Sequence, residues 1–553
     1  MAKMKGGRAI MDSVLDYGID TIFGIPGGQT YELFDALYAK GDDINLITTR
    51  SEQGAAYMAF GYARSSGKVG VYTVVPGPGV LNSGAALTTA YAGNEPVLCL
   101  TGQVPSNGIG RGVGYLHDVP DQLGILERMT KWATRIDHPS HAPGAVREAF
   151  RQLTTGRRRP VSLEMALDVM SEDAEVEMLE PITHPETVVA DPALIEQAAE
   201  LLANAKKPMI LVGTGAINAC DEIRQLAELL QAPVVSQRGG RGVLSDRHYL
   251  AHTFPAGHRM WPEVDVAIAI GTRFKYPRMH WGTDVNLKTI HIDIDPTEIG
   301  RISKPDVGII ADAAPAVASL LSSLAAQNVQ QRPSRQQKLE AFQQEMRQLY
   351  SDNVQPQMSI LTVIRDALSE DGILVDEITQ VGYTSWYGYP VYAPRTLITS
   401  GYAGNLGYGL PTAIGVKVAN PDKRVISISG DGGFLFHCGE LATAVRYQLN
   451  MVIIVFSDGA YGNVARAQTK RYDGRVIGTD LTNPDFAAMA RSFGATGYTV
   501  DSVAELEEKI QMGFEQEGPV VIEMPLTKTD FPWKYLLLGE NRSNRMLQSQ
   551  NTE

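Results

Sequence analysis

Short apolar runs alternate with amphipathic segments along most of this chain. Between residues 19 and 170 the runs are rich in Val, Ile and Thr, and the segments between them show helical spacing of apolar positions. Because strands that alternate with helices form βαβ units, this pattern predicts a parallel sheet covered by helices. The predicted strands span residues 21–24, 44–48, 69–75, 96–101 and 160–164.

The same alternation recurs twice further along the chain. Prolines without apolar periodicity mark residues 180–192 as a linker, and the Gln- and Ser-rich stretch 326–337 is expected to be an exposed connection. We therefore predict an α/β protein of three doubly wound parallel-sheet domains, at residues 1–180, 192–330 and 355–530, with a C-terminal tail at 531–553. The later strands are expected at residues 208–212, 264–270, 289–294, 373–375, 425–428, 452–456 and 520–523.

Composition narrows the classes of partner. A formal net charge of −13 argues against nucleic acid or an anionic membrane, since both require a basic face. The 3 cysteines lack CxxC spacing and are expected to be buried apolar residues. Neither a signal peptide nor an uninterrupted apolar stretch of membrane-spanning length is evident, so a soluble, cytoplasmic protein is the expectation.

Two carboxylates follow neighbouring predicted strands of the third domain. Asp431 lies in the sequence Gly-Asp-Gly-Gly after the strand at 425–428, and Asp458 follows the strand at 452–456. Parallel strands end at one edge of a sheet, so the pair predicts an oxygen-rich pocket for a hard divalent cation carrying a diphosphate. A helix expected from about residue 436 to 447 offers free N–H groups to a phosphate. An isolated Gly-Asp-Gly is usually a structural turn, but a second carboxylate at this spacing favours the metal site.

The Gly-Asp-Gly-Gly segment, together with Ser-Asp-Gly-Ala-Tyr-Gly-Asn at residues 457–463, resembles the thiamine diphosphate motif of the acetolactate synthase and 2-oxoacid decarboxylase superfamily. The resemblance implies Mg²⁺ bound by Asp431, Asp458 and the carbonyl of Ala460. The family usually has two asparagines at residues 457–458, and aspartate there keeps an oxygen ligand. The implied cofactor-binding residues are Gly404, Leu406, Gly430, Gly432, Gly433, Asp458, Tyr461, Gly462 and Asn463.

Residues 50–56, Arg-Ser-Glu-Gln-Gly-Ala-Ala, resemble the family signature RHEQGAA. The resemblance implies that Glu52 bonds the pyrimidine N1′ and assists proton transfer at the cofactor. Taken alone, a glutamate in the first turn of a helix is usually a favourable partner of the helix dipole. Ser51 replaces the histidine that the family often has. Gln103 matches the glutamine that the family places near the thiazolium.

Leu406, in Gly-Asn-Leu-Gly at residues 404–407, matches the segment that bends the cofactor into its V shape. It is the implied apolar wedge, whereas without the resemblance it reads as core packing. Residues 24–28 and 77–82 resemble two further family loops, although Pro and Gly at such density describe any tight turn.

The predicted middle domain carries a partial dinucleotide fingerprint, Gly-Thr-Gly at residues 213–215, without the third glycine. Relatives bind FAD, an adenine nucleotide or nothing in this domain, and the sequence leaves all three open. The positions of interest are Gly213, Gly215, Arg273 and Asp293.

The resemblance implies cleavage or ligation of a C–C bond next to a carbonyl, with a 2-oxo acid as substrate. An acetolactate synthase-like carboligase, a 2-oxoacid decarboxylase or other C–C lyase, and a non-catalytic cofactor-binding relative remain alternatives. Ala467 replaces a tryptophan of biosynthetic acetolactate synthases, which weakens the assignment to that group.

His117 is a candidate for proton transfer or carboxylate binding, although a lone histidine is more often structural. In the family the first and third domains meet across a subunit interface, which implies a homodimer or homotetramer. The remaining candidates for the substrate pocket are Gln29, Tyr31, Leu116, Gln380 and Tyr383.

Overall fold

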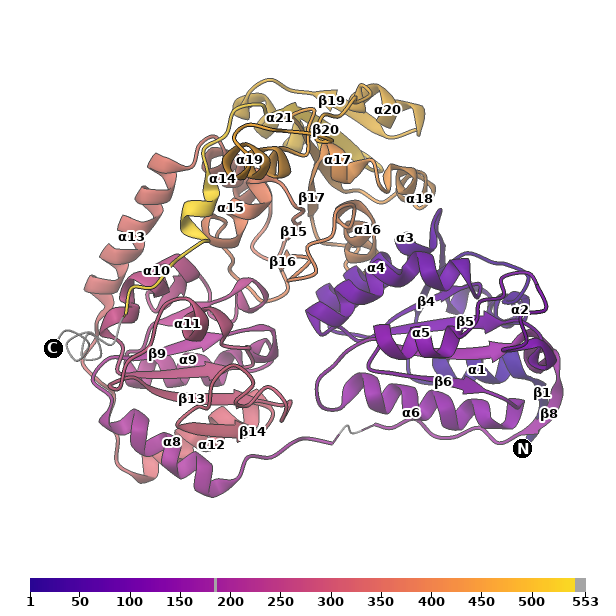
Figure 1. Ribbon diagram of the computed structural model, residues 1–553, viewed down its shortest axis with the longest axis horizontal. Coiled ribbons are helices and arrows are strands. Elements are labelled where there is room, and N and C mark those ends of the chain that lie inside the picture. Colours follow the sequence, from indigo (N-terminus) through magenta and orange to yellow (C-terminus); the bar gives the residue numbers. More distant parts are fainter. Residues whose placement is uncertain (184–185, 543–553) are drawn as a thin grey trace. The chain divides into compact units, whose positions relative to one another are not determined.

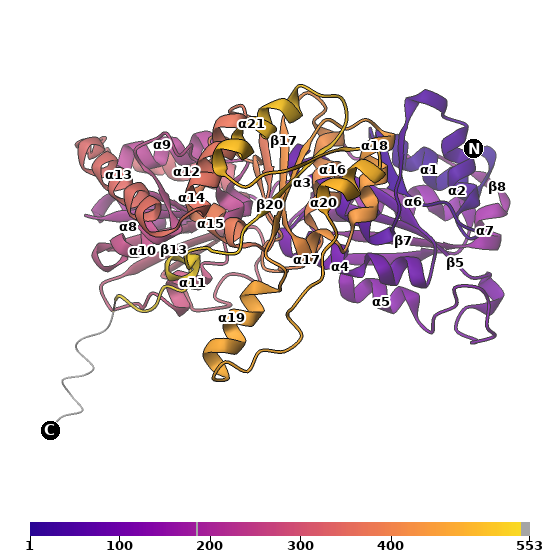
Figure 2. The same cartoon turned by 90° about the horizontal axis from the view of Figure 1, so that it is seen from above.

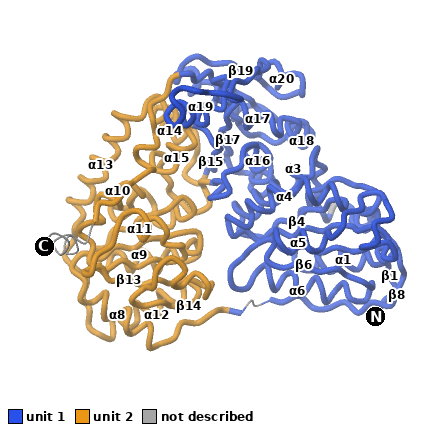
Figure 3. The backbone as a smooth tube through the Cα atoms, in the orientation of Figure 1, with its two compact units in different colours: residues 1–186, 372–379, 398–527 blue, residues 187–371, 380–397, 528–553 orange. Residues whose placement is uncertain are grey.

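The computed structural model describes residues 1–183 and 186–542, and the chain forms two compact units (Figure 3). Unit 1 contains residues 1–186, 372–379 and 398–527, and unit 2 contains residues 187–371, 380–397 and 528–553. The predicted linker includes residues 184–185 and the predicted tail includes residues 543–553, which lie outside the described residues. Among the described helices, none is long and apolar enough to cross a membrane.

The N-terminal sheet of unit 1 is six-stranded, with the order β3-β2-β4-β5-β7-β6 and parallel pairing (Figure 1). Successive residues point to opposite faces of a strand, so Val71 and Tyr72 of β4 join two different buried clusters. Helices therefore cover both faces. The strands are β2 (Thr21–Gly24), β3 (Asn45–Thr48), β4 (Gly70–Val74), β5 (Val97–Gln103), β6 (Trp132–Ile136) and β7 (Val161–Ala166). The helices are α1 (Gly6–Leu15), α2 (Tyr31–Tyr38), α3 (Glu52–Ser66), α4 (Pro78–Gly93), α5 (Gln122–Met129), α6 (Ala142–Thr154) and α7 (Leu167–Ser171); β1 (Ala2–Lys5) and β8 (Asp173–Val176) form a separate antiparallel pair.

The C-terminal sheet of unit 1 has the order β16-β15-β17-β18-β20-β19, and its central strands pair parallel. Its strands are β15 (Ile373–Val375), β16 (Leu397–Ile398), β17 (Val425–Gly430), β18 (Val452–Ser457), β19 (Thr496–Thr499) and β20 (Val520–Pro525). Its helices are α16 (Gly409–Ala419), α17 (Asp431–Phe434), α18 (Leu441–Arg446), α19 (Gly462–Arg471), α20 (Phe486–Ser492) and α21 (Val503–Phe514).

Helices α3 and α16 join the two sheets of unit 1. Glycines allow the close approach: a methyl group at Gly61 would lie 2.1 Å from the Thr412 carbonyl oxygen, and one at Gly415 would lie 1.9 Å from that of Met58. Both sheets contribute side chains to one continuous buried cluster. The segments that carry Glu52 and Asp431 thus belong to one packed body.

Unit 2 contains the middle sheet, in the order β11-β10-β9-β12-β13-β14, with parallel pairing. Helices α14 and α15, which lie within the predicted third domain, group with this unit. The strands are β9 (Pro208–Val212), β10 (Val234–Ser236), β11 (Ala251–Thr253), β12 (Val266–Ile270), β13 (Lys288–Asp293) and β14 (Val307–Ile310). The helices are α8 (Pro192–Asn204), α9 (Cys220–Leu230), α10 (Phe254–Met260), α11 (Lys275–Met279), α12 (Ala313–Ala326), α13 (Gln336–Asn353), α14 (Gln357–Ala367) and α15 (Gln380–Gly388).

The α/β class with three parallel sheets is confirmed, and every predicted strand overlaps an observed one. Short strands such as β6, β10 and β16 were not predicted, because a run of two to five residues carries little periodicity. The helix expected from about residue 436 to 447 is wrong. The chain instead forms the short α17, a 3₁₀ turn at Cys438–Glu440 and then α18. His437 leaves helical geometry (φ −134°, ψ 24°), and Gly439 is a poor helix former.

Candidate functional site

The ends of β17 and β18 bring the two predicted metal ligands together. The strands are neighbours, with Gly430 paired to Phe456. Asp431 is buried, and its Oδ2 accepts hydrogen bonds from the backbone N–H groups of Asp458 at 3.1 Å and Gly459 at 2.8 Å. The loop carrying the second carboxylate is therefore folded onto the first.

The electrostatics of this pair fit a cation. Burial, and next the charge of Asp431, raise the pKa of Asp458. The Asn483 Nδ2 donates to Asp431 Oδ2 at 2.7 Å, while its own Oδ1 is buried without a hydrogen-bond partner. Two crowded carboxylates and an unpartnered amide oxygen match the hard ligands that Mg²⁺ prefers. The sequence pattern did not indicate Asn483, since it lies in an irregular loop.

Within the described residues, no group of three or more His, Cys, Asp or Glu side chains is placed to hold a metal. Neutral oxygens would have to complete the shell, and the backbone at Ala460 is suited to this. Ala460 forms an antiparallel bridge with Asp480 in which Tyr461 N–H donates to Thr479 and Leu481 N–H donates to Gly459. Because backbone groups alternate in direction along an extended segment, the N–H and C=O of Ala460 face away from that ladder. The N–H indeed donates to Asp458 Oδ1, at 3.2 Å.

The glycines of the turn allow neighbouring groups to approach more closely than a side chain would permit. A methyl group at Gly432 would lie 2.7 Å from the Tyr461 ring, and one at Gly433 would lie 2.0 Å from Glu377 Oε1. A methyl group at Gly462 would lie 2.6 Å from Asp458 Oδ2. Of the predicted binding residues, Gly430 and Gly432 flank Asp431 in the sequence, the Tyr461 ring packs against Gly432, and Gly462 packs against Asp458. Gly433 packs against Glu377, and Asn463 follows Gly462 at the start of α19. Gly462 begins α19, which stands off the sheet in Figure 2 and buries no side chain.

The loop with Leu406 is held on both sides. Gly404 adopts φ +62° and Gly407 φ +79°, a left-handed geometry that favours glycine. The Asn405 Nδ2 donates to Tyr57 Oη at 3.0 Å and to the Ala85 carbonyl at 2.9 Å, so the loop is tied to α3 and α4. Leu406 itself is only half-buried.

Glu52 is the first residue of α3. Its Oε2 accepts a hydrogen bond from Asn82 Nδ2 at 3.1 Å. Asn82 ends the family-like segment 77–82 and lies in the first turns of α4, so it orients the predicted acid. Ser51 is the N-cap: its Oγ accepts from the Gly54 N–H at 2.9 Å. The hydroxyl in place of the family's histidine therefore has a clear local function.

Glu440 was missed by the sequence reasoning. Its buried carboxylate accepts hydrogen bonds from the backbone N–H groups of Arg50 and Ser51, and from the Ser51 hydroxyl. Burial raises the pKa of Glu440. This carboxylate anchors the start of the helix that carries Glu52 to the C-terminal sheet. In the sequence it is one polar position in an amphipathic segment and gives no distinctive signal.

Gln103 is buried within a polar network of the N-terminal sheet. Its Oε1 accepts from the Val104 N–H at 2.8 Å, and its Nε2 lies 3.5 Å from Glu164 Oε2. Gln122 donates to the same Glu164 oxygen at 2.8 Å and accepts from the Gly77 N–H at 2.7 Å. The side-chain amide of Gln103 is thus engaged internally.

Three of the substrate candidates meet on unit 1. The Gln29 Nε2 donates to the Leu116 carbonyl at 2.8 Å, and its Oε1 lies 3.0 Å from His117 Nδ1. His117 has φ +67°, and the side chains of Tyr31 and Leu116 are exposed. Gln380 and Tyr383 lie on α15 of unit 2, where the Tyr383 ring packs against Trp533 at 4.5 Å.

The middle-domain glycines pack backbone against backbone. A methyl group at Gly213 would lie 2.5 Å from the Gly271 carbonyl oxygen, and one at Gly215 would lie 2.8 Å from the Gly271 Cα. Asp293 ends β13, and its Oδ1 accepts from the Asp295 N–H at 3.0 Å. Arg273 follows β12 by three residues. The two glycines of the fingerprint are therefore explained by close packing of loops.

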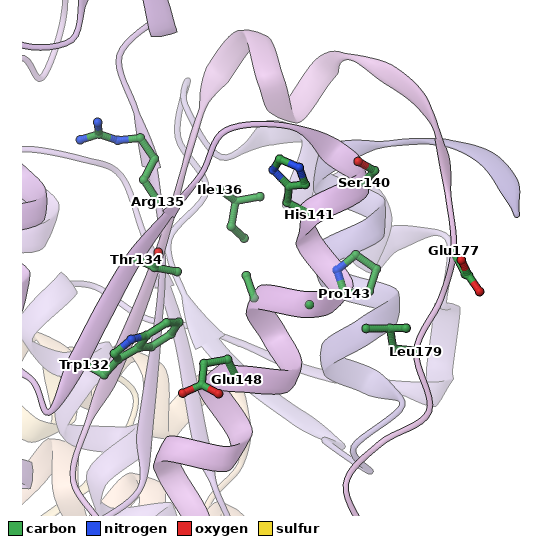
Figure 4. A pocket seen from close by; sticks show the side chains of 12 residues that line it. Trp132, Thr134, Arg135, Ile136, Ser140, His141, Pro143, Glu148, Glu177 and Leu179 are labelled. Carbon is green, nitrogen blue, oxygen red and sulfur yellow. The ribbon is translucent and has the colours of Figure 1, made fainter.

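An open pocket lies on the N-terminal domain, lined by Trp132, Arg135 and Ile136 of β6 and by His141 and Glu148 at α6 (Figure 4). None of the predicted cofactor residues contributes to its lining. It is separate from the arrangement described above.

The chain matches the thiamine pyrophosphate enzyme family over its N-terminal TPP binding domain (residues 4–125), its central domain (195–320) and its C-terminal TPP binding domain (377–524). A probable acetolactate synthase large subunit of Methanocaldococcus jannaschii is 35% identical over 549 residues, covering 94% of this chain and 92% of that protein. A probable 2-ketoarginine decarboxylase of Pseudomonas aeruginosa is 32% identical, covering 94% of each chain. The acetolactate synthase of Bacillus subtilis is 31% identical, covering 96% of this chain and 94% of that protein.

Proposed function

The chain belongs to the thiamine pyrophosphate enzyme family, and we propose that it is a Mg²⁺-dependent carboligase that joins a fragment of a 2-oxo acid to a second carbonyl compound. The observation that carries the proposal is the pair of carboxylates at the ends of β17 and β18, folded onto each other beside the Gly430–Gly433 turn. Relatives named acetolactate synthase that align over nearly the whole chain support the ligation reaction.

In this proposal Asp431, Asp458 and the Ala460 carbonyl hold Mg²⁺. The backbone of Gly430, Gly432 and Gly433 lines the diphosphate, with Tyr461, Gly462 and Asn463 on the opposite side. Leu406 and the Gly404 carbonyl receive the thiazolium and pyrimidine portion. The fit rests on the crowded carboxylates and the unpartnered Asn483 oxygen.

When bound, thiamine diphosphate supplies a carbanion that adds to a carbonyl and an electron sink for the adjacent bond. The chain's own acid–base group is Glu52, which holds a proton at the pyrimidine ring. Asn82 keeps the Glu52 carboxyl oriented, while Ser51 and Glu440 fix the helix start from which it projects. Gln103 and His117 are the other proposed catalytic residues, and His117 is held by Gln29.

Gln29, Tyr31 and Leu116 of unit 1 are proposed to line the substrate pocket. Gln380 and Tyr383, on α15 of unit 2, stay separate candidates for substrate contact. Amide and phenol groups suit a 2-oxo acid better than a charged polymer, in keeping with the net charge of −13.

A decarboxylase that releases an aldehyde is the second candidate. The relative named probable 2-ketoarginine decarboxylase aligns with this chain as completely as the acetolactate synthases do. Ala467 also lies on the exposed α19, where biosynthetic acetolactate synthases resembling this chain place a tryptophan.

The proposed working form is at least a homodimer. Three apolar side chains near Asn82 and His117 are exposed: Leu81, Val113 and Leu116, at 51%, 54% and 69%. A second subunit that supplied its C-terminal domain here would cover them. Sedimentation with and without the cofactor and Mg²⁺ tests this.

The cytoplasmic location and the nucleotide question stay predictions. Gly213, Gly215, Arg273 and Asp293 are the positions that an FAD or adenine nucleotide would approach. An absorbance spectrum of the purified protein, followed by mass spectrometry of the released small molecules, decides between FAD, an adenine nucleotide and neither.

The decisive experiment incubates the protein with thiamine diphosphate, Mg²⁺ and a panel of 2-oxo acids, alone or with carbonyl acceptors. Mass spectrometry then distinguishes ligated products from released aldehydes. Glu52→Gln is expected to lower kcat by about a hundredfold or more, because a positioned proton donor is lost. Thiamine diphosphate binding, followed by tryptophan fluorescence, should persist. A fully active Glu52→Gln protein would contradict the proposed acid–base residue.

A further inference from the structure

Glu377 is a buried carboxylate that the proposed chemistry does not use. It follows β15, and both of its oxygens are bonded. Oε1 accepts from the Gly407 N–H at 2.6 Å, and Oε2 accepts from the Ser429 hydroxyl at 2.7 Å. The Gly409 N–H adds a third donor. Burying a carboxylate is costly even when donors compensate it, and the three donors here come from two segments of the chain, so the presence of Glu377 calls for a specific explanation.

The donors come from the two loops proposed to hold opposite ends of the cofactor. Gly407 directly follows Leu406, and Ser429 directly precedes Gly430. The carboxylate also lies against the turn itself, since a methyl group at Gly433 would be 2.0 Å from Glu377 Oε1. Glu377 therefore occupies the joint between the Leu406 loop and the diphosphate turn.

The other side of Gly407 is also held. Its carbonyl accepts from His437 Nδ1 at 2.7 Å, and His437 is buried. Since burial lowers the pKa of His437, the ring is neutral and donates through Nδ1. A methyl group at Gly407 would lie 2.4 Å from the Phe436 Cβ. The backbone next to Leu406 thus has a single position, fixed by Glu377 through its N–H and by His437 through its C=O.

We propose that Glu377 is a positioning residue that locks the Leu406 loop to the diphosphate turn, and so sets the distance between the apolar wedge and the metal–diphosphate site. This inference rests on the proposed function, because it requires that both loops bind one cofactor. A carboxylate is suited to the joint because it accepts at both oxygens. The amide of glutamine accepts at only one atom. Its NH₂ group would face either the Gly407 N–H, which cannot reverse its direction, or the Ser429 hydroxyl, which would lose its acceptor.

The test compares two probes that use the loops differently. Mg²⁺–pyrophosphate contacts only the diphosphate turn, whereas Mg²⁺–thiamine diphosphate requires both loops. In Glu377→Gln, calorimetric titration of the full-length protein at pH 8, where the wild-type carboxyl is ionised, should show thiamine diphosphate affinity reduced by about tenfold or more, the loss of one charge-assisted hydrogen bond. Affinity for Mg²⁺–pyrophosphate should be unchanged. The matched control is Glu507→Gln, an exposed glutamate on α21, which should leave both affinities at the wild-type value.

Two results would overturn the proposal. One is wild-type affinity for thiamine diphosphate in Glu377→Gln, and the other is an equal loss for both probes, which indicates general structural damage. If Glu377→Gln does not fold, Ser429→Ala replaces it, because this variant keeps the carboxylate and removes its bond to the turn. The proposal would also be overturned if Ser429→Ala and the wild type had the same ratio of affinity for thiamine diphosphate to affinity for pyrophosphate. Failure of the proposed function is separate, since wild-type protein would then bind thiamine diphosphate no better than pyrophosphate.

Discussion

The C-terminal sheet of unit 1 and the middle sheet of unit 2 share a parallel layout and carry glycine-rich turns after a central strand, yet different groups surround the two turns. After β17, glycines pack against the side chains of Tyr461 and Glu377, and two carboxylates and an unpartnered amide oxygen lie beside them. After β9, glycines bring the loop backbone against Gly271. A glycine motif at a strand end therefore marks close approach in both sheets. Only the polar groups beside it distinguish a ligand site from loop packing.

The largest expected effect comes from replacing one aspartate at the end of a strand in each sheet and comparing cofactor binding and kcat/KM of the two variants. Asp431→Asn removes a metal ligand and replaces an acceptor of several N–H groups with a side chain that also donates. We expect thiamine diphosphate binding with Mg²⁺ to be lost and kcat/KM to fall by about a thousandfold or more. Asp293→Asn, at the end of β13, should leave both unchanged. Titration calorimetry and steady-state kinetics measure the pair. Equal losses in the two variants would remove the distinction between the sheets.

A second pair of variants adds one methyl group to each glycine turn. Gly433→Ala places it 2.0 Å from the Glu377 carboxylate, and Gly215→Ala places it 2.8 Å from the Gly271 backbone. We expect Gly433→Ala to weaken thiamine diphosphate binding by about ten- to a hundredfold. Gly215→Ala should instead lower the free energy of unfolding by about 1–3 kcal/mol, because the backbone cannot yield, while cofactor affinity stays unchanged.

Cofactor titrations and thermal denaturation of both proteins separate the two outcomes. A Gly215→Ala protein with normal stability and weakened cofactor binding would show that the middle loops are part of the ligand site after all. A Gly433→Ala protein with normal binding would show that the Glu377 carboxylate moves freely.

The contrast explains what the sequence could predict. Apolar runs of at least four residues bounded by turns, such as residues 208–212 and 452–456, revealed the central strands because burial on both faces leaves few polar positions. The proximity of Asp431 and Asp458 could be predicted because their spacing places both at the ends of neighbouring strands. Glu377, Glu440 and Asn483 could not be predicted, since each acts through a contact with a segment at least 30 residues away. Such contacts are set by tertiary packing and leave no local pattern.

The broken helix at residues 436–447 illustrates the same limit. The spacing of its apolar residues is helical. However, His437 has a non-helical backbone and its ring donates to the Gly407 carbonyl, and Gly439 favours the helix only weakly. A tertiary hydrogen bond from a buried loop thus overrides a local preference.

The smallest expected effect is a dependence of the free energy of unfolding on pH. It arises from one carboxyl group of the C-terminal sheet, that of Glu377. Burial, with a further contribution from Asp376, raises the pKa of Glu377 to about 7. The folded protein therefore favours the protonated form, whose stabilising contribution is complete below the ordinary glutamate value and is lost as pH rises through about 7. The wild-type free energy of unfolding should fall relative to that of Glu377→Gln over this interval, by no more than about 1.4 kcal/mol for each pH unit.

Thermal denaturation of the cofactor-free proteins between pH 5 and 8 measures the difference, with Glu507→Gln as the control expected to follow the wild type. A difference between wild type and Glu377→Gln that stayed constant with pH would mean that Glu377 does not change its protonation in this range, and that its three donors outweigh the cost of burial.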